Sequence, residues 1–405
     1  MIDLEAARAR VLEGCVALAP IRVPLAGAAG LVLAEPVVSD QSLPPFANTA
    51  VDGYAVRAGD VAGATAERPV RLAVVETLAA GVASDRAVGP GEAMRIMTGA
   101  PIPAGADAVV MVEDTDGAAH GGDVEIRRPV QPGDAVRPAG DDVRPGDVLF
   151  GPGDVLSPAH LGVLASLGRT DVLAHPRPRV GVISTGDELV EGPVALQPGQ
   201  IRDSNRITLL ALVEAAGAVG VDLGLVRDDE DLIRAAFVAA AADCDAIISS
   251  GGVSMGEFDF VKRVLDEVGR MNWMQVAIRP AKPLAFGTID GTPVFGLPGN
   301  PVSSMVSFEL FARPGLRRLA GHGPDRLVRP AVRAITAEPL RRTPDGKTHF
   351  VRVEADNVDG RYVVRSAGGQ GSHQLAVMAA ADALVVLPDG DGVAAGAEVS
   401  VLLFG

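Results

Sequence analysis

The spacing of apolar residues predicts different secondary structure in successive parts of the chain. Residues 1–35 are expected to form a helix followed by extended chain. Residues 68–150 contain short strands separated by Pro-Gly turns, in which proline fixes φ and glycine accepts a positive φ. A helical pattern returns at 156–168, and the proline-rich segment 176–179 marks a boundary. The first part of the chain is therefore predicted to join an N-terminal helical and extended domain to a β-rich one.

The next part of the chain alternates regularly between strands and helices. Such alternation is typical of a parallel sheet that helices cover on both faces. The predicted strands are 180–184, 219–226, 246–249 and 293–297, and the predicted helices are 206–216, 232–242, 259–268 and 302–311. Beyond residue 325 the pattern again favours strands. The predicted fold class is a multi-domain α/β plus β chain, with a central doubly wound α/β domain and a small C-terminal β-domain.

Composition narrows the classes of function. The 405 residues have a formal net charge of −15 and only 3% aromatic residues, so neither nucleic acid nor an anionic membrane surface is expected as a partner. Two cysteines and six scattered histidines favour neither a disulfide framework nor a thiolate metal site. The acidic N-terminus and the lack of a run of 18 apolar residues favour a cytoplasmic protein.

Residues 245–268 hold the most informative motif. An apolar strand ends in two serines and two glycines at 249–252, and a helix begins near Asp259. Glycine lets a ligand approach the backbone, and the first N–H groups of a helix attract anions. Glu257 and Asp259 would repel a bare phosphate in this corner. The combination predicts a metal ion between the carboxylates and an anionic ligand.

Other carboxylates follow the neighbouring strands, at the edge where open α/β sheets bind ligands. Glu188 follows the strand at 180–184, and Asp228 follows the strand at 219–226. Each acidic residue taken singly is consistent with an ordinary solvated turn or with a charge at a helix N-terminus. The convergence of Glu188, Asp228, Glu257 and Asp259 favours a metal site, and Mg²⁺ suits such oxygen ligands together with substrate phosphates.

Two further segments are candidates for ligand binding. The segment 298–301 follows the last predicted strand; it is either a ligand loop or only a helix start, with Asn300 as N-cap and Pro301 at the first helical position. Arg279 and Lys282 lie three residues apart in a proline-rich segment. That segment is either a solvated basic turn or a clamp for an oxyanion.

Six motifs extend over nearly the whole chain: Asn48-Thr-Ala-Val-Asp-Gly-Tyr-Ala-Val, Met97-Thr-Gly-Ala-Pro-Ile-Pro, Ser184-Thr-Gly-Asp-Glu-Leu, Ser249-Ser-Gly-Gly-Val-Ser-Met-Gly, Gly296-Leu-Pro-Gly-Asn-Pro-Val-Ser and Gly369-Gln-Gly-Ser-His. In sequence and order they resemble the molybdopterin molybdotransferase (MoeA) family, which is related to the gephyrin E-domain. The resemblance implies four domains. These are a discontinuous N-terminal domain (1–45 and 140–176), an inserted β-rich domain (46–139), a molybdopterin-binding α/β domain (177–324) and a C-terminal β-domain (325–405).

The resemblance also implies an activity. Members of the family insert molybdenum from molybdate into adenylylated molybdopterin, with Mg²⁺, and release AMP to give molybdenum cofactor. A homodimer is implied, whose active cleft lies between the α/β domain of one subunit and N-terminal parts of the other. Other proteins of molybdenum cofactor biosynthesis are possible partners.

The family's functional positions carry over to individual residues. The catalytic positions match Asp52, Thr98, Asp142, Glu188, Asp228 and Asp259, of which Glu188, Asp228 and Asp259 are expected to bind Mg²⁺. The expected substrate-binding residues are Ser249, Ser250, Gly251, Gly252, Pro298, Gly299, Asn300 and Pro301, and those for molybdate are Arg279, Lys282, Arg352 and Ser372. The family's basic loop usually reads Lys-Pro-Gly-Lys, whereas this chain has Arg279-Pro-Ala-Lys282. Arginine presents a planar fork, and alanine accepts a positive φ less readily than glycine.

Two other functions stay open. The α/β domain alone also resembles the adenylyltransferase that makes the adenylylated pterin, although those enzymes typically consist of that single domain. A non-catalytic scaffold like the gephyrin E-domain would instead bind a peptide in an exposed apolar groove. Carboxylate substitutions would leave the scaffold's function intact.

Overall fold

The computed structural model describes residues 1–117, 122–251 and 260–404. The chain divides into two compact units, one of residues 1–34, 152–157 and 171–405, the other of residues 35–151 and 158–170. The four domains expected from the sequence are a finer division and stay a prediction. No helix in the described part of the chain is both long and apolar enough to cross a membrane.

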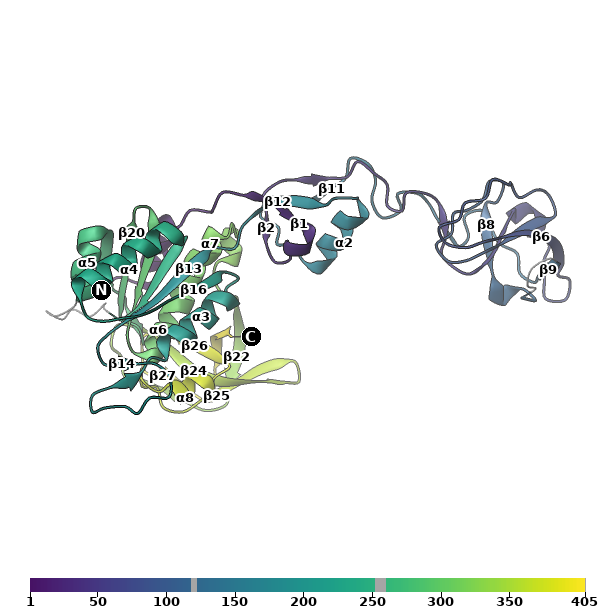
Figure 1. Ribbon diagram of the computed structural model, residues 1–405. Helices are drawn as coiled ribbons and strands as arrows, with labels where there is room; N and C mark the ends of the chain where they lie inside the picture. Colours follow the sequence, from purple (N-terminus) through teal and green to yellow (C-terminus); the bar gives the residue numbers. More distant parts are fainter. Residues whose placement is uncertain (118–121, 252–259, 405) are drawn as a thin grey trace. The chain divides into compact units, whose positions relative to one another are not determined.

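A six-stranded sheet with helices on both faces forms the centre of the first unit (Figure 1). In sheet order its strands are β16 (Val219–Val226), β13 (Arg179–Thr185), β17 (Ala246–Ser250), β21 (Thr292–Leu297), β20 (Pro283–Ile289) and β18 (Arg270–Gln275). The first four are parallel, as predicted, whereas β20 and β18 are antiparallel. Strands β20 and β18 were not predicted, because they lie on either side of the proline-rich segment 278–283.

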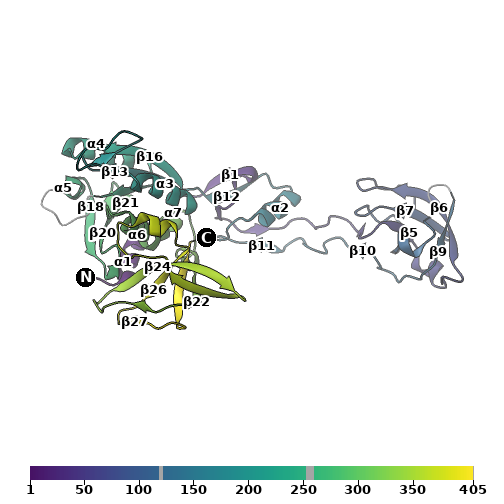
Figure 2. The same cartoon turned by 90° about the horizontal axis from the view of Figure 1, so that it is seen from below.

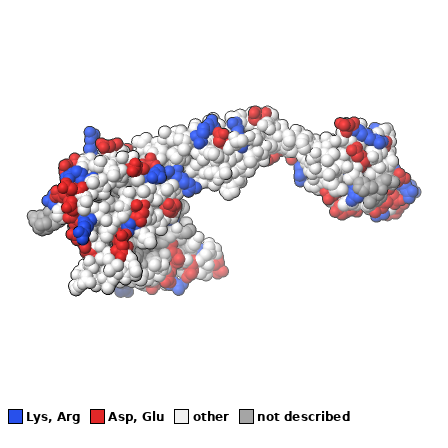
Figure 3. Space-filling model, viewed as in Figure 1, with Lys and Arg blue, Asp and Glu red and all other residues white. Residues whose placement is uncertain are grey.

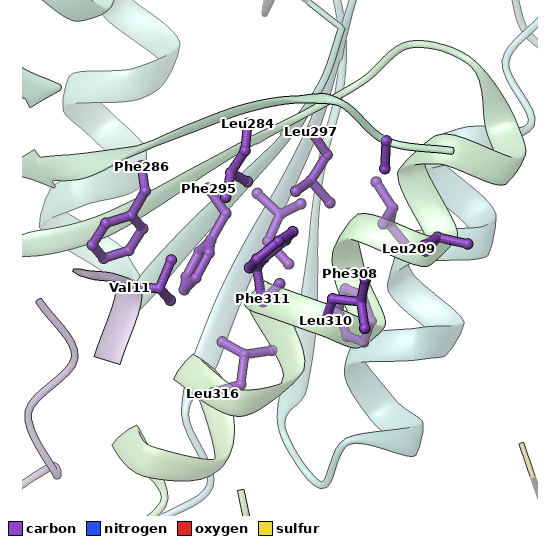
Figure 4. Packing of buried hydrophobic residues seen from close by; sticks show 14 of the residues in the cluster. Val11, Leu209, Leu284, Phe286, Phe295, Leu297, Phe308, Leu310, Phe311 and Leu316 are labelled. Carbon is purple, nitrogen blue, oxygen red and sulfur yellow. The ribbon is translucent and has the colours of Figure 1, made fainter. Parts of the chain in front are cut away.

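The alternation of side chains along the strands explains why both faces are covered. Val182 and Ile248 belong to one buried cluster, whereas Ile183 and Ile247 belong to another, as the two-residue period of a strand requires. The helices whose residues join the first cluster are α1 (Leu4–Glu13), α3 (Asn205–Ala215), α6 (Pro301–Ser307), α7 (Arg313–Leu319) and α8 (Leu375–Ala379); those of the second are α4 (Glu230–Asp243) and α5 (Phe260–Val268). Figure 4 shows part of the first cluster, including Phe295. Burying such a side chain contributes about 1.5–3 kcal/mol.

The last helical segment is longer than the sequence pattern predicts. Instead of ending at Phe311, the chain passes from α6 through a π-helical turn, Phe308–Ala312, into α7. Pro314 has no N–H to donate to the preceding turn. The Leu310 carbonyl accepts a hydrogen bond from Arg8 Nε of α1 instead, at 3.3 Å. A contact between distant parts of the sequence thus stabilises a helical segment that the local sequence pattern predicted to be shorter.

The C-terminal part of the first unit is a closed β-barrel. Its strands, in order around the barrel, are β24 (Thr348–Val358), β25 (Arg361–Ser366), β22 (Ala331–Thr336), β28 (Glu398–Leu403) and β26 (Ala383–Leu387), which pairs back with β24. These strands confirm the β-pattern predicted beyond residue 325. The short strand β19 (Ile278–Arg279) pairs with β24, so the basic loop of the α/β part is attached to the barrel.

Smaller elements complete the first unit. A three-stranded sheet joins β1 (Ile21–Pro24), β12 (Asp171–His175) and β2 (Val32–Leu33). The remaining elements are β14 (Leu189–Val190), β15 (Ile201–Arg202), β23 (Leu340–Arg341), β27 (Gly392–Val393) and α8 (Leu375–Ala379).

The second unit is β-rich, as the turn pattern predicts. Its main sheet, seen in Figure 2, has the order β8 (Ala108–Met111), β5 (Gly53–Val56), β7 (Glu92–Ile96), β6 (Val70–Leu78) and β9 (Asp123–Ile126). Two strand pairs, β3 (Val37–Val38) with β11 (Val148–Phe150) and β4 (Asn48–Thr49) with β10 (Val136–Arg137), and the helix α2 (Pro158–Ser166) make up the rest. Apolar side chains, Tyr54 and Met94 among them, are fully buried on the two faces of the main sheet.

Candidate functional site

The loops that follow β17 and β21 meet at the carboxyl edge of the central sheet. Gly251 comes directly after β17 with φ +97°, a left-handed conformation that favours glycine. Its N–H donates to the Leu297 carbonyl at the end of β21, over 3.0 Å. Ser249 and Ser250 are buried at the end of β17, so their hydroxyls do not lie on the surface. A ligand at this edge would meet the backbone rather than these side chains.

Asn205, which was not predicted from the sequence, joins these two loops. At the start of α3, its Nδ2 group donates to Ser250 Oγ and to the Gly299 carbonyl, both at 2.7 Å. One amide group therefore fixes the loop after β17 against the loop after β21. In the sequence, Asn205 is recognisable as a polar residue just before the predicted helix at 206–216. Its hydrogen-bond partners, however, are 45 and 94 residues away in the sequence.

The segment 298–301 forms the predicted helix start. Asn300 is the N-cap of α6 and Pro301 occupies the first turn, yet the Asn300 side chain makes no capping hydrogen bond. The Val302 N–H donates to the Ser372 carbonyl at 3.1 Å. The helix N-terminus thus fixes the barrel loop that carries Ser372.

A cleft of about 510 Å³ lies beside this helix start. Of the expected residues, Arg279, Lys282, Pro298, Asn300 and Ser372 line it. No carboxylate is among the described residues that line the cleft. Two cations with hydroxyl and amide donors form an environment that suits an oxyanion.

Lys347 lines the same cleft and was not predicted as a site residue. Its ammonium group pairs with Asp345 at 3.0 Å, and this hydrogen bond is the main cause that lowers the pKa of Asp345 to about 2. The signal for Lys347 was the scarcity of lysine, since the chain has only three. Lys347 is far from Arg279 and Lys282 in the sequence, so the sequence did not show that all three line one cleft.

Ala281 adopts the conformation that the family's glycine would favour. Its φ is +77°, and it lies buried between Arg279 and Lys282. The alanine therefore retains the loop geometry at a cost of about 1–2 kcal/mol in backbone strain. Arg279 extends from β19, whose pairing with His349 of β24 fixes its backbone.

Arg352 lies beneath the cleft rather than on its surface. Only 1% of the residue is exposed. Its guanidinium donates to Gln370 Oε1 at 3.2 Å and to the carbonyls of Gly369 and Gly371, both at 2.9 Å. Burial lowers its pKa. These bonds hold the loop that presents Ser372, so the structure supports a positioning role; direct contact with molybdate stays a prediction.

Two of the three expected metal ligands lie in described loops. Asp228 and Asp187 bind each other reciprocally, each backbone N–H donating to the other's carboxylate at 3.3–3.4 Å. Glu188 lies against Gly186, where an added Cβ would come within 2.5 Å of its Oε2, so a side chain at 186 would displace it. Asp259 and Gly252, like Glu257, lie outside the described residues. Within the described ranges, no three His, Cys, Asp or Glu residues gather as a metal site.

The remaining expected residues belong to the second unit. Asp52 precedes β5 and Thr98 follows β7, and the antiparallel pairing of these strands brings the two side chains together. Asp142 is exposed, and its N–H donates to the Leu43 carbonyl at 2.9 Å. Gly53 must be glycine, because a Cβ there would lie 2.0 Å from the Val110 carbonyl oxygen.

The face of the described residues that is seen in Figure 3 shows no continuous basic track. On the face seen in Figure 3, Lys and Arg side chains are interspersed with Asp and Glu. Nucleic-acid binding proteins instead gather their cations on one face. The visible distribution agrees with a small-molecule ligand.

The fold and the strand-end loops define a class, a multi-domain protein built around a molybdopterin-binding α/β domain. Residues 2–168 match the MoeA N-terminal region (domain I and II), residues 181–318 the probable molybdopterin binding domain, and residues 333–404 the MoeA C-terminal region (domain IV). The chain belongs to the molybdopterin molybdenumtransferase (MoeA) family.

Individual relatives agree with this assignment over their full length. Molybdopterin molybdenumtransferase 2 of Mycobacterium tuberculosis H37Rv is 44% identical over 398 residues, which are 96% of each chain. Molybdopterin molybdenumtransferase of Haemophilus influenzae is 38% identical and covers 99% of this chain and 98% of its own. The crystal structure of a molybdopterin biosynthesis MoeA protein from Pyrococcus horikoshii OT3 covers 100% of both chains, with a TM-score of 0.82 and 30% identity.

Proposed function

We propose that this protein inserts molybdenum into adenylylated molybdopterin, using molybdate and releasing AMP. Membership of the family supports a role in molybdenum cofactor biosynthesis. The observation that carries the finer proposal is the cleft lined by Arg279, Lys282 and Ser372, without a carboxylate among its described lining. Cations and hydroxyl donors on several sides of a small cleft are what a tetrahedral oxyanion such as molybdate requires.

The chain's own residues would act mainly by positioning. Arg279, Lys282 and Ser372 would bind the oxyanion close to the dithiolene sulfurs of the pterin. The backbone at Gly251 and Gly299, fixed by Asn205, would admit the nucleotide end of the substrate. Orienting two bound reactants and stabilising the charge that develops can supply most of a rate enhancement.

Mg²⁺ fits the donors present at the strand ends. Carboxylate oxygens are the ligands it prefers, and it commonly takes one or two from protein and the rest from phosphate and water. We infer that Glu188, Asp228 and Asp259 hold the ion. When bound, Mg²⁺ would neutralise charge on the phosphoanhydride.

A second copy of the chain completes the proposed site. Asp52, Thr98 and Asp142 belong to a different compact unit from the cleft. We propose a cytoplasmic homodimer in which these residues of one subunit face the strand ends of the other. A variant with Asp52 replaced should then regain activity when mixed with a variant defective only in the cleft.

One assay tests the reaction. The protein is incubated with adenylylated molybdopterin, Mg²⁺ and molybdate, and AMP is measured. We expect molybdate-dependent AMP release, which Asp228→Asn should strongly reduce at a low, fixed Mg²⁺ concentration. Consumption of ATP with molybdopterin would instead identify an adenylyltransferase. Absence of turnover with either substrate would favour the non-catalytic scaffold. The carboxylate substitutions would then leave its peptide binding unchanged.

A further inference from the structure

A second cationic pocket lies in the first unit, lined by residues other than those of the cleft. It encloses about 170 Å³. The side chains of Arg177, Arg317, His175 and His322 line it, together with small residues at the ends of α3 and α7 such as Gly217 and Ala320. No Asp or Glu is found among its described lining residues. In a chain with a net charge of −15, such a concentration of positive charge requires an explanation.

Arg317 has no carboxylate partner within the described ranges. Its Nε donates to the Arg326 carbonyl, and its Nη2 lies 3.4 Å from His322 Nδ1. Burial and the neighbouring Arg313, Arg326 and Arg329 lower its pKa to about 10. The guanidinium is thus charged at neutral pH but half-buried among other cations. An anion in the pocket would relieve this repulsion.

Glu309, an acidic residue beside this arginine group, is already paired. Glu309 accepts from Arg329 at 2.7 Å and lies 3.8 Å from Arg313. Arg177, which also lines the pocket, is exposed and donates to the Ala29 carbonyl at 2.9 Å. Two guanidinium groups therefore line the pocket with donors to spare and with no ion pair among the described residues.

His322 supplies a neutral donor to the same space. Burial, followed by Arg317 and Arg326, lowers its pKa to about 4, so the imidazole is uncharged at pH 7. Because Nδ1 faces the Arg317 guanidinium, the ring proton is assigned to Nε2. An imidazole N–H beside two guanidinium groups is a usual arrangement for binding phosphate-like oxygens.

Most carbonyl groups in the last turns of the two helices that border the pocket are hydrogen-bonded within the protein. At the end of α3, the carbonyls of Leu212, Val213 and Glu214 accept N–H groups from 216–218. At the end of α7, the Arg317 and Arg318 carbonyls accept the N–H groups of His322 and Gly321. The negative ends of both helices are therefore largely satisfied by their own caps.

We propose that this pocket is a second oxyanion site, which binds a phosphate-like tetrahedral group through Arg177 and Arg317. Its volume corresponds to about six water molecules at roughly 30 Å³ each, enough for one such group and a few waters. Because its walls come from 30–32, 175–177 and the ends of α3 and α7, binding should stabilise this junction. The site does not depend on the proposed reaction.

Equilibrium dialysis of the full-length protein with radiolabelled phosphate tests the proposal. To remove phosphate binding in the cleft, the measurement is made in an Arg279→Gln background. There we expect saturable binding that Arg317→Gln and Arg177→Gln each weaken at least tenfold. Phosphate should also raise the Tm in this background, but not when Arg317→Gln is added, at matched ionic strength. Arg177 is exposed, so Arg177→Gln keeps the test valid if Arg317→Gln folds poorly.

Competition identifies the source of the oxyanion. Displacement of labelled phosphate by AMP would show that the site takes phosphate monoesters, and displacement by molybdate but not AMP would restrict it to free oxyanions. Either pattern of displacement supports the site, provided that the displaceable phosphate binding disappears in Arg177→Gln. Phosphate binding that both arginine substitutions leave intact, or that only Arg279→Gln removes, would overturn the proposal.

Discussion

The Asp52 carboxylate accepts two hydrogen bonds from Thr98, one from the backbone N–H and one from the hydroxyl, both at 2.7 Å. These bonds are the main causes that lower the pKa of Asp52 below its ordinary value of 3.8. The register of β5 with β7, which places Gly53 opposite Ile96, determines the pairing. Two residues 46 positions apart in the sequence thus form one polar group on the second unit.

Removing the hydroxyl should change the titration of Asp52. In Thr98→Val the carboxylate loses one of its two bonds, so its pKa should rise toward the ordinary value, measured by NMR titration. A folded-state pKa below the unfolded value stabilises the protein above the unfolded pKa, and this contribution disappears as pH falls through the folded pKa. The variant should therefore be less stable than the wild type at neutral pH and equal to it at strongly acidic pH. An unchanged Asp52 pKa would show that the hydroxyl bond is not formed in solution.

The strand-end carboxylates should set the requirement for Mg²⁺. Asp228→Asn and Glu188→Gln each remove a hard oxygen ligand, and we expect the Mg²⁺ concentration for half-maximal AMP release to rise at least tenfold. EDTA should abolish turnover in the wild type. The matched control is Asp231→Asn, whose side chain is 94% exposed at the start of α4. A Mg²⁺ dependence of Asp228→Asn equal to that of the control would exclude Asp228 as a ligand.

Experiments can distinguish whether Arg352 positions the 369–371 loop or contacts molybdate directly. Arg352 bonds to Gln370 through both its backbone N–H and its guanidinium, and Gln370 in turn lines the cleft. If Arg352 acts through the 369–371 loop, Gln370→Ala should reproduce most of the effect of Arg352→Gln. Both should raise the KM for molybdate severalfold with a smaller change in kcat. A normal KM in Gln370→Ala, beside a large defect in Arg352→Gln, would favour direct contact.

The sequence predicted the elements better than the contacts between them. Strands such as β13 and β17 were predicted to within one residue at each end, because their apolar runs stop at glycine and serine. Strands β18 and β20 were missed because they flank a basic, proline-rich loop. The sequence pattern also predicted that the last helix ends at Phe311. It does not show that Arg8 donates to the Leu310 carbonyl, which Pro314 leaves without a backbone donor.

For the site as well, the sequence predicted residues better than it predicted the contacts between them. Family motifs identified Arg279, Lys282 and Ser372, which line one cleft. Asn205 and Lys347 carry no motif, and their importance lies in partners and neighbours that only the tertiary structure brings close. The burial of Arg352 was likewise unpredictable, because arginine is rarely found fully buried.

The basic loop should become more stable when its alanine is replaced by the family's usual glycine. Ala281 has φ +77°, and relief of that strain, less the extra entropy of glycine in the unfolded chain, predicts a gain of about 0.5–1 kcal/mol for Ala281→Gly. Thermal unfolding would measure it. The control is Ala277→Gly, which lies in the same segment but has no positive φ, and should lose stability. Since the loop already has the geometry that glycine favours, the KM for molybdate should change less than twofold in Ala281→Gly. A large change in KM would mean that the alanine side chain itself shapes the oxyanion site.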